Sequence, residues 1–315
     1  MTDARLALDK GLEMRDAWQK YWQDAASQSA VTTQAGRAAL TVFWTEWLGR
    51  TIKRDNAKVL DLACGHGVVS KIVRDLSPTS HLFCLDIAPA AVSHVRAQLG
   101  RERVYPIVGD ACDTPLETAS FDIVLSQFGV EYASLDALKR AANLIAPDGA
   151  LAIICHMKDG AIAKECANNL GVLEQLIASG VFGAMRSVFD PDIAFNEAAL
   201  RQAVQNVYGV LSQSKGGSAA QYADRLIKDM GQLFERRNAY APKDAIAWLD
   251  QQESAAQAFA GRMQSMLGAA LDTGQMEEVC DVYTGAGLHN VELIPMSLGQ
   301  EAEHAAWCLS AQRAV

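Results

Sequence analysis

The stretch that decides the fold is Val59–Ser70, with the sequence VLDLACGHGVVS. It has the pattern of a short apolar strand that ends in an acid, followed by a tight turn of small residues and an apolar helix start. Glycine lets the backbone take a positive φ and lets a ligand approach the main chain closely. The free N–H groups at the start of the helix then face that ligand. The stretch therefore predicts a nucleotide-binding turn.

Two classes of cofactor use a turn of this kind. From Gly65 onward the spacing is G-x-G-x-x-S, close to the dinucleotide fingerprint but with Ser70 where glycine or alanine is expected. From Asp61 onward it is D-x-A-x-G-x-G, which resembles motif I of the class I S-adenosylmethionine-dependent methyltransferases, with Ala63 in place of the family's usual glycine. The turn alone leaves both classes open.

The next predicted strand, His81–Asp86, also ends in an acid. A carboxylate at this position can accept hydrogen bonds from both ribose hydroxyls. Both cofactor classes share this feature, so Asp86 indicates a nucleoside without choosing between them.

Three later motifs favour the methyltransferases. A predicted strand at 104–108 ends in Gly109-Asp110-Ala111, and the next strand begins Ser-Phe-Asp-Ile-Val at 120–124. The turn Ala146–Ala150 and the strand Leu151–Cys155 then match the family's L-x-P-G-G turn and fifth strand, with Asp148-Gly149 in place of Gly-Gly. The resemblance covers residues 58–156. It implies an α/β fold, a doubly wound seven-stranded and mainly parallel sheet, with N-terminal helices and a helical insertion.

The remaining chain suggests where that core is interrupted. Residues 1–50 are predicted to be helical, with a second helix capped by Thr32 or Thr33. Residues 159–273 are alanine-rich with few strand signals, and are punctuated at Pro191, Gly216-Gly217 and Pro242. A helix at 276–286 and strands at 290–295 and 304–310 resemble the family's last elements, the final strand being antiparallel. We therefore expect a core of 51–158 and 274–315, an N-terminal lid at 1–50, and an insertion at 159–273 that serves as substrate cap or dimer surface.

Composition narrows the classes of partner. The formal net charge is −9 and no dense run of Lys or Arg occurs, which argues against nucleic acid. No apolar run approaches the ~18 residues that span a bilayer, and no signal peptide is seen. Seven cysteines without paired spacing suit a reducing compartment, so we expect a cytoplasmic protein without a membrane partner.

The resemblance implies roles for individual residues around S-adenosylmethionine. The methionine part would be surrounded by the glycine turn, and the ribose would be held by Asp86 with Ile87 packing on the adenine. Asp110 and Ala111 would read the adenine edge, and Gln127 and Phe128 would border the methyl group. The predicted cofactor residues are Asp61, Ala63, Gly65, Gly67, Asp86, Ile87, Asp110, Ala111 and Gln127.

Aromatic residues near the N-terminus have two interpretations. Trp18, Tyr21 and Trp22 recur near helical spacing, so they can belong to helices that pack on the core. They can instead cover the cofactor or line the substrate pocket together with Phe128, because many small-molecule methyltransferases carry a similar N-terminal lid helix.

A general base is needed only where the attacking atom of the acceptor arrives protonated. The candidates are His156, at the end of the fifth strand, and Glu131 with Tyr132, just after the fourth. These assignments rest on position, since a base must reach the proton it removes.

The absence of several motifs narrows the class of methyl acceptor. The fourth strand ends in Ser126-Gln127-Phe128-Gly129, without the Asn/Asp-Pro-Pro-aromatic pattern of DNA amine methylation. Acids that would hold magnesium in catechol-type enzymes are absent there, and no Pro-Cys pair marks a cytosine C5 nucleophile. We therefore expect metal-independent methyl transfer to a small molecule by in-line displacement, with S-adenosylhomocysteine as product.

Two other hypotheses remain open. A non-catalytic protein that binds S-adenosylmethionine or S-adenosylhomocysteine would use its helical insertion to bind a partner or a second copy, because a cofactor constellation does not prove turnover. A nicotinamide-dependent oxidoreductase would explain the G-x-G-x-x-S spacing.

Overall fold

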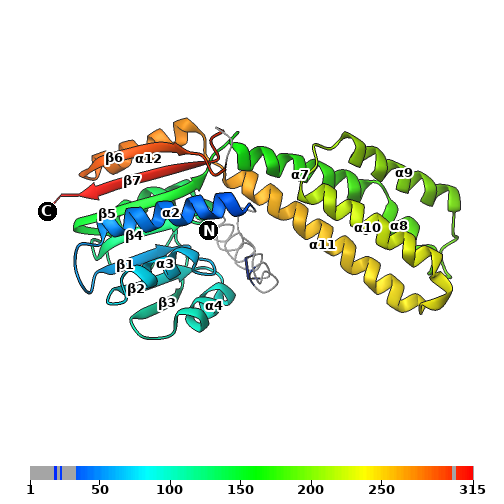
Figure 1. The fold of residues 1–315 in the computed structure, drawn as a ribbon, viewed down its shortest axis with the longest axis horizontal. Helices are drawn as coiled ribbons and strands as arrows, with labels where there is room; N and C mark the ends of the chain where they lie inside the picture. The colour runs from blue at the N-terminus through cyan, green and yellow to red at the C-terminus, as the bar shows by residue number, and fades with distance from the viewer. Residues whose placement is uncertain (1–17, 20–21, 23–32, 300–302, 315) are drawn as a thin grey trace, which may run out of the picture. The chain divides into compact units, whose positions relative to one another are not determined.

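The computed structural model describes residues 18–19, 22, 33–299 and 303–314. The chain divides into two compact units (Figure 1). The first, Met1–Ile162 with Ala269–Val315, holds the sheet and is called the sheet unit. The second, Ala163–Gly268, is called the helical unit.

A seven-stranded sheet in the order β3-β2-β1-β4-β5-β7-β6 forms the sheet unit. Of the described strands, only β7 runs antiparallel to its neighbours β5 and β6. The predicted doubly wound, mainly parallel sheet with an antiparallel final strand is thereby confirmed. The strands are β1 (Lys58–Leu62), β2 (His81–Asp86), β3 (Val104–Val108), β4 (Phe121–Gln127), β5 (Ile145–His156), β6 (Leu288–Met296) and β7 (Ala306–Arg313).

The strand order reverses at β1, which lies between β2 and β4. In an open α/β sheet, a ligand binds outside the carboxyl ends of the strands at such a switch point. The carboxyl end of β1 is where the glycine turn begins.

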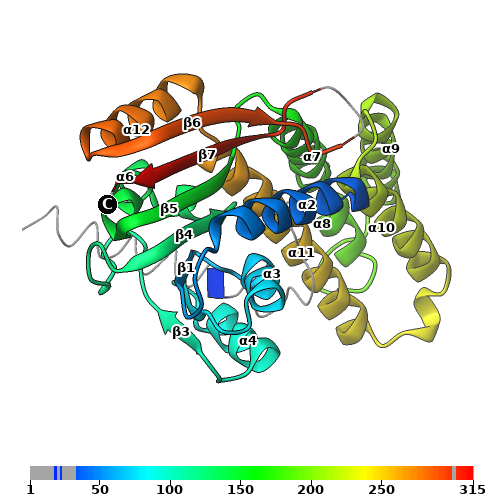
Figure 2. The same ribbon diagram turned by 60° about the vertical axis from the view of Figure 1, so that its left-hand side comes forward.

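Helices cover both faces of this sheet (Figure 2). On one face α2 packs against α3, and α4 contacts β2 and β3; on the other, α12 packs with α6. The helices of the sheet unit are α2 (Gln34–Thr51), α3 (Val68–Leu76), α4 (Pro89–Leu99), α5 (Val130–Ala133), α6 (Leu135–Arg140), the 3-10 turn η1 (Ala141–Leu144) and α12 (Thr273–Gly285).

Successive side chains of β1 point alternately into the hydrophobic core and toward the opposite face of the sheet. Leu60 and Leu62 belong to one buried cluster with Leu138 of α6 and Tyr283 of α12. The Tyr283 hydroxyl is buried there and donates to the Leu138 carbonyl at 2.7 Å. Successive side chains on a strand point to opposite faces. Asp61 therefore points to the α3 face, where its partner lies.

Strand β5 is longer than the predicted Leu151–Cys155. It begins at Ile145 because Ile145 pairs with Phe121, while Ala150 pairs with Ile123, so the predicted turn at 146–150 is an irregularity within the β4–β5 pair. Gly149 lies at this irregularity against backbone. A Cβ there would lie 2.8 Å from the Ala146 oxygen and 2.9 Å from the Asp122 oxygen.

Two N-terminal helices are predicted, and the structure describes the second. Thr33 caps α2, its hydroxyl oxygen accepting from the Gly36 N–H at 3.1 Å. Within the first predicted helix, Trp18, Gln19 and Trp22 are described and helical. Its other residues, Tyr21 included, lie outside the described residues.

The described part of the helical unit contains no strand. Breaks lie where the sequence predicts them: a loop holds Pro191, α10 begins directly after Gly216-Gly217, and α11 begins at Pro242. Buried Asn169 accepts from the Ala219 N–H at 3.1 Å and so caps α10. The helices are α7 (Ala161–Ala178, which begins in the sheet unit), α8 (Val181–Arg186), α9 (Glu197–Gln213), α10 (Ser218–Glu235), the 3-10 turn η2 (Arg237–Ala239) and α11 (Pro242–Ala269, which ends in the sheet unit).

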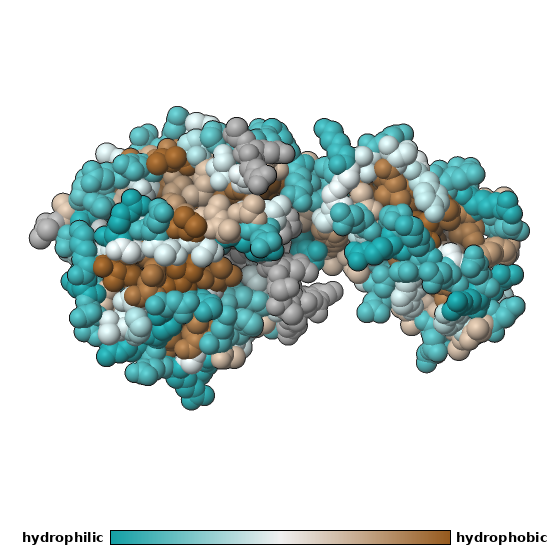
Figure 3. All heavy atoms as spheres, viewed as in Figure 1, coloured by the Kyte–Doolittle hydropathy of each residue, from teal (hydrophilic) through white to brown (hydrophobic). Residues whose placement is uncertain are grey.

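On the surface of the sheet unit, Figure 3 shows apolar residues gathered on the face that carries α2 and α3, where Val42, Val68 and Leu76 are exposed. Within the described part of the chain, no helix combines the length and apolar character needed to cross a bilayer. The cytoplasmic location remains a prediction.

The contacts of Gly149 predict the effect of a single methyl group. We expect Gly149→Ala to lower the free energy of unfolding by about 1–3 kcal/mol, because backbone oxygens cannot move aside as a flexible side chain can. The measurement is chemical unfolding of the full chain. Gly171→Ala in α7 is the matched control, because open space surrounds Gly171 and alanine is the better helix former. Equal losses in the two variants would contradict the prediction.

Candidate active site

The turn between β1 and α3 is held in a left-handed conformation at three residues. Ala63, Gly65 and Gly67 have φ of 56°, 51° and 74°. Glycine adopts this conformation freely, whereas an alanine does so at a cost of about 1 kcal/mol. Phe128, at the end of β4, is also left-handed with φ 51°. Ala63 and Phe128, the two non-glycine residues among these four, directly follow the neighbouring strands β1 and β4 at the same edge of the sheet.

Gly129 explains why these two loops touch. A Cβ on Gly129 would lie 2.6 Å from the Ala63 oxygen and 2.8 Å from the Ala63 Cβ, so only glycine fits without a shift. This close approach was not predicted from the sequence. A glycine directly after a predicted strand is the signal that could have indicated it.

Asp61 is buried and turned toward α3. Its Oδ2 accepts from the Ser70 N–H at 3.0 Å and from the Ser70 hydroxyl at 2.5 Å. Burial raises the pKa of Asp61 to about 7, against the lowering effect of the two bonds from Ser70. Asp61 thus binds the start of α3 and does not line the cavity described below. Its predicted contact with the methionine part of a cofactor remains a proposal that this geometry does not favour.

Asp86 links the end of β2 to the glycine turn. Its Oδ2 accepts from the Gly65 N–H at 2.8 Å and its Oδ1 from the Ala88 N–H at 2.9 Å. Burial raises the pKa of Asp86, and the bonds from Ala88 and Gly65 oppose that effect. Each carboxylate oxygen has a second lone pair, so Asp86 can accept from a ligand as well.

A cavity of about 60 Å³ lies at the carboxyl ends of β1, β2, β3 and β4. It brings together most of the residues that the sequence assigns to a cofactor or substrate. Its lining residues are Trp18, Trp22, Ala63, Leu85, Asp86, Ile87, Gly109, Asp110, Ala111, Phe128, Gly129, Tyr132 and Ala133.

Besides Asp61, three predicted cofactor residues do not line this cavity: Gly65, Gly67 and Gln127. Gly67 is the N-cap of α3. Gln127 accepts at Oε1 from the Trp44 indole N–H at 2.6 Å, and Trp44 is fully buried on α2. The sequence did not predict this contact, because only the packing of α2 on the sheet brings Trp44 to the end of β4.

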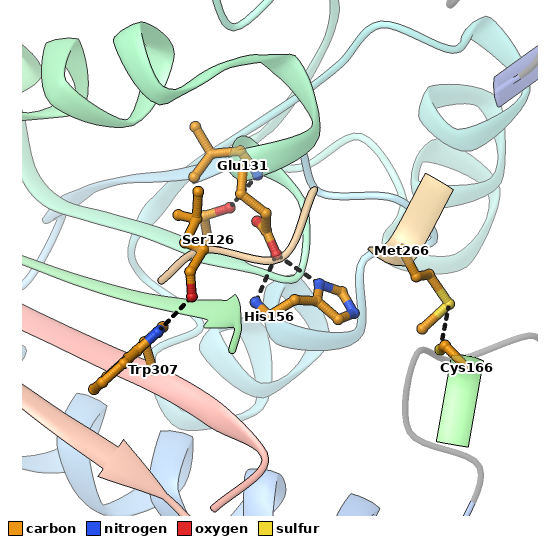
Figure 4. Close-up of polar contacts among 8 residues, drawn as sticks. Ser126, Glu131, His156, Cys166, Met266 and Trp307 are labelled. Carbon is orange, nitrogen blue, oxygen red and sulfur yellow. Dashed lines mark hydrogen bonds and ion pairs between the residues drawn. The ribbon is translucent and has the colours of Figure 1, made fainter. Parts of the chain in front are cut away.

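Figure 4 shows a buried pair of titratable side chains, Glu131 and His156. The pair lies next to Phe128 and Tyr132, which form the aromatic wall of the cavity. Glu131 Oε1 lies 2.8 Å from His156 Nδ1 and 3.1 Å from the His156 backbone N. Carboxylate oxygens accept, so the histidine donates from Nδ1. The imidazole contacts the rings of Phe128 and Tyr132, with centroid distances of 4.5 and 5.5 Å.

The other two polar atoms of this pair have no partner. Glu131 Oε2 and His156 Nε2 are buried without a hydrogen bond within the described structure. A buried polar atom without a partner costs about 1–3 kcal/mol, and most such atoms in proteins are satisfied. Two such atoms therefore lie on one interacting pair at the end of β5 and the turn after β4.

His66 of the glycine turn stacks on His94 of α4, with ring centroids 4.0 Å apart. Desolvation, followed by the neighbouring His94, lowers the pKa of His66. This stack joins the turn to α4 without adding a lining residue to the cavity.

A larger cavity, of about 630 Å³, lies elsewhere on the sheet unit. Trp47, Arg54 and Asp122 are among its lining residues, and none of the predicted site residues is. Among the residues that the structure describes, no group of three or more His, Cys, Asp or Glu side chains could hold a metal ion.

A family model described as a methyltransferase domain matches residues 59–149. A malonyl-[acyl-carrier protein] O-methyltransferase of Geobacter sulfurreducens is 28% identical over 44% of this chain and 51% of that protein. A probable phthiotriol/phenolphthiotriol dimycocerosates methyltransferase of Mycobacterium ulcerans is 37% identical over 22% of this chain and 27% of that protein. The chain spans about half the length, or less, of the curated relatives it matches.

A solved S-adenosylmethionine-dependent methyltransferase from Aquifex aeolicus is 20% identical, with a TM-score of 0.33 over 37% of this chain and 65% of that chain. At this TM-score the likeness carries no weight. The matched model and the sheet order together define a methyltransferase domain. The match over residues 59–149 agrees with the resemblance to the class I S-adenosylmethionine-dependent methyltransferases that the sequence motifs predict.

The raised pKa of Asp61 predicts how stability depends on pH. Its folded-state pKa of about 7 exceeds the ordinary 3.8, so the folded protein binds more protons than the unfolded chain between these values. The free energy of unfolding therefore falls as pH rises from about 4 to about 7. We expect Asp61→Asn to remove much of this slope and to raise stability at pH 8 by a few kcal/mol, at 1.36 kcal/mol per pKa unit.

Chemical unfolding at several pH values measures this slope. Asparagine retains an oxygen that can accept from Ser70, so the α3 contact survives. A weaker slope of the same sign remains from Asp86, whose pKa is also raised. Asp75→Asn, at an exposed site on α3, is the control. Parallel curves for wild type and Asp61→Asn would contradict the assignment.

Proposed function

We propose that this chain transfers a methyl group from S-adenosylmethionine to a small-molecule acceptor whose attacking atom arrives protonated, and that His156 removes the proton. The observation that carries the proposal is the Glu131–His156 pair beside the aromatic wall of the cavity, with His156 Nε2 left without a partner. The proposal assigns no residue to a metal.

The residues around the cavity fit an adenosyl group. Asp86 keeps acceptor capacity on both oxygens, and Ile87 offers an apolar side chain next to it. Asp110 holds the loop after β3 by accepting from the Cys112 N–H at 2.8 Å, and it lines the same cavity with Ala111. We propose Asp86 for the ribose, Ile87 for the adenine face, and Asp110 with Ala111 for the adenine edge.

When bound, S-adenosylmethionine supplies an electrophilic methyl group. The protein's part is to exclude water, hold the acceptor and accept its proton. Glu131 orients the imidazole by accepting from Nδ1, which leaves Nε2 as the ring nitrogen that can take up the acceptor's proton. Ser126 supports this arrangement: its hydroxyl oxygen accepts from the Val130 N–H at 3.2 Å and so holds the turn that leads to Glu131.

A buried base narrows the class of acceptor. A carboxylate with an ordinary pKa near 4 is already ionised at neutral pH and needs no base. A hydroxyl or an acidic C–H does need one, and the aromatic wall of Phe128 and Tyr132 suits a planar or apolar acceptor. We therefore propose a phenol, an enol or a carbon acid as the acceptor class.

The helical unit and the assembly state are further proposals. We propose that the helical unit contributes to acceptor specificity as a substrate cap or supports a homodimer. The formal net charge of −9 supports a small-molecule acceptor over a nucleic acid.

Loss of the ribose acceptor tests the cofactor assignment. Asp86→Ala should weaken S-adenosylmethionine binding at least several-fold in calorimetric titration, because it removes a charge-assisted acceptor. Exposed Asp113→Ala, on the loop after β3, is the control and should bind as wild type does. NAD is titrated in parallel. Binding of NAD but not S-adenosylmethionine would overturn the proposed function in favour of an oxidoreductase, whereas unchanged affinity in Asp86→Ala would remove Asp86 from the ribose.

Replacement of His156 tests its proposed role as the base. With an acceptor found by screening phenols, β-dicarbonyl compounds, amines and carboxylic acids, His156→Ala should lower kcat by about 10²–10⁴-fold while cofactor affinity is retained. Glu131→Gln should lower kcat less, because the imidazole remains and only its orientation weakens. Exposed His289→Ala is the control. Full turnover in His156→Ala, or transfer to carboxylic acids alone, would overturn the proposed role of the base.

A further inference from the structure

The cavity is too small for the ligand that its walls fit. Small-molecule sites typically enclose about 300–1,000 Å³, whereas this one holds about 60 Å³. Two of its walls are the indoles of Trp18 and Trp22. The missing volume is therefore taken up at least in part by side chains from the N-terminal part of the chain.

Trp22 lies directly on the glycine turn. Its Cζ2 and Cη2 atoms lie 2.7 and 2.8 Å from the position that a Cβ on Gly65 would occupy. A backbone without a side chain at this point would let a ligand approach the main chain. In this structure the indole makes that approach, and it also packs on His66 with ring centroids 4.3 Å apart.

Two other described residues of this part of the chain, Trp18 and Gln19, contact other loops around the cavity. The Trp18 ring meets Tyr132 edge-on at a centroid distance of 4.9 Å. Gln19 Oε1 accepts from the Ala90 N–H at 2.9 Å. Ala90 lies in the first turn of α4, where a backbone N–H has no partner within the helix. The contacts thus involve the β1–α3 turn, the start of α4 and the turn after β4.

We propose that Trp18, Gln19 and Trp22 form an autoinhibitory plug: Trp22 occupies the volume that the cofactor needs, and cofactor binding displaces it. The inference rests on the proposed function, because it takes the cofactor assigned to this cavity. A plug and a lid that closes over bound cofactor have opposite effects on the affinity for the cofactor. A lid adds contacts to the complex, so its removal weakens binding, whereas removal of a plug strengthens it.

The expected gain in cofactor affinity follows from the linkage between displacement of the plug and binding of the cofactor. When a protein binds a ligand only in its open form, the apparent affinity is reduced by the fraction of molecules that are open. Anchors on three loops keep that fraction low. We expect Trp22→Ala to bind S-adenosylmethionine about tenfold more tightly than the wild type.

Gln19→Ala separates displacement from a simple gain of space. Gln19 does not line the cavity, so its truncation leaves the cavity walls unchanged and removes only the anchor to Ala90. A plug predicts tighter binding in this variant too, by a smaller factor. Trp248→Ala in α11, a partly buried tryptophan of the helical unit, is the control and should leave the affinity unchanged.

The experiment is calorimetric titration of S-adenosylmethionine into the full-length wild type, Trp22→Ala, Gln19→Ala and Trp248→Ala. Tighter binding in the first two variants supports the plug, and it does so even where the wild type shows no measurable binding. Measurable wild-type binding with equal or weaker binding in Trp22→Ala overturns the plug and leaves the proposed function standing. A gain in Trp22→Ala without one in Gln19→Ala also overturns it, because added space then explains the result. Absence of binding in all four proteins overturns the proposed function and the plug together.

Discussion

The hydrogen bond from the Gly65 N–H to Asp86 is the contact on which the candidate site depends. It ties the turn after β1 to the end of β2, the strand that pairs with β1 along its length. The turn carries three left-handed residues, and two backbone hydrogen bonds also hold it, from the Cys64 N–H to the Leu85 oxygen and from the Gly67 N–H to the Cys64 oxygen, both 2.9 Å. The buried carboxylate adds to that support and still has lone pairs for a ligand.

This arrangement costs stability, and the cost is concentrated at one edge of the sheet. Burial raises the pKa values of Asp61 and Asp86, Ala63 and Phe128 are held at positive φ, and Glu131 and His156 each leave an atom unpartnered. Backbone strain and poorly satisfied polar groups cluster where function requires them. The opposite face of β1, with Leu60 and Leu62 in the buried cluster with α6 and α12, contributes the apolar packing that offsets the cost.

The aromatic residues connect the cavity to the Glu131–His156 pair. Trp18 packs on Tyr132, and Tyr132 packs on His156, so one row of rings runs from the N-terminal residues to the buried pair. Phe128 completes the wall and contacts the same imidazole. The described N-terminal residues thus contact the cavity directly and, through Tyr132, the Glu131–His156 pair.

The sequence by itself determined the sheet, most strand positions and the methyltransferase class, because apolar strands, glycine turns and terminal acids are local patterns that recur in a set order. It also indicated Asp86, Ile87, Asp110 and Ala111, which lie at or just after the carboxyl ends of β2 and β3 and so meet at one edge. Only the tertiary structure decided which side chains pair across that edge: Asp61 with Ser70, Gln127 with Trp44, and Glu131 with His156. These partners depend on strand register, loop closure and helix packing, which bring together residues far apart in the chain. The contact of Trp22 with Gly65 also depends on tertiary packing, since helical spacing shows that an aromatic face exists but not what it covers.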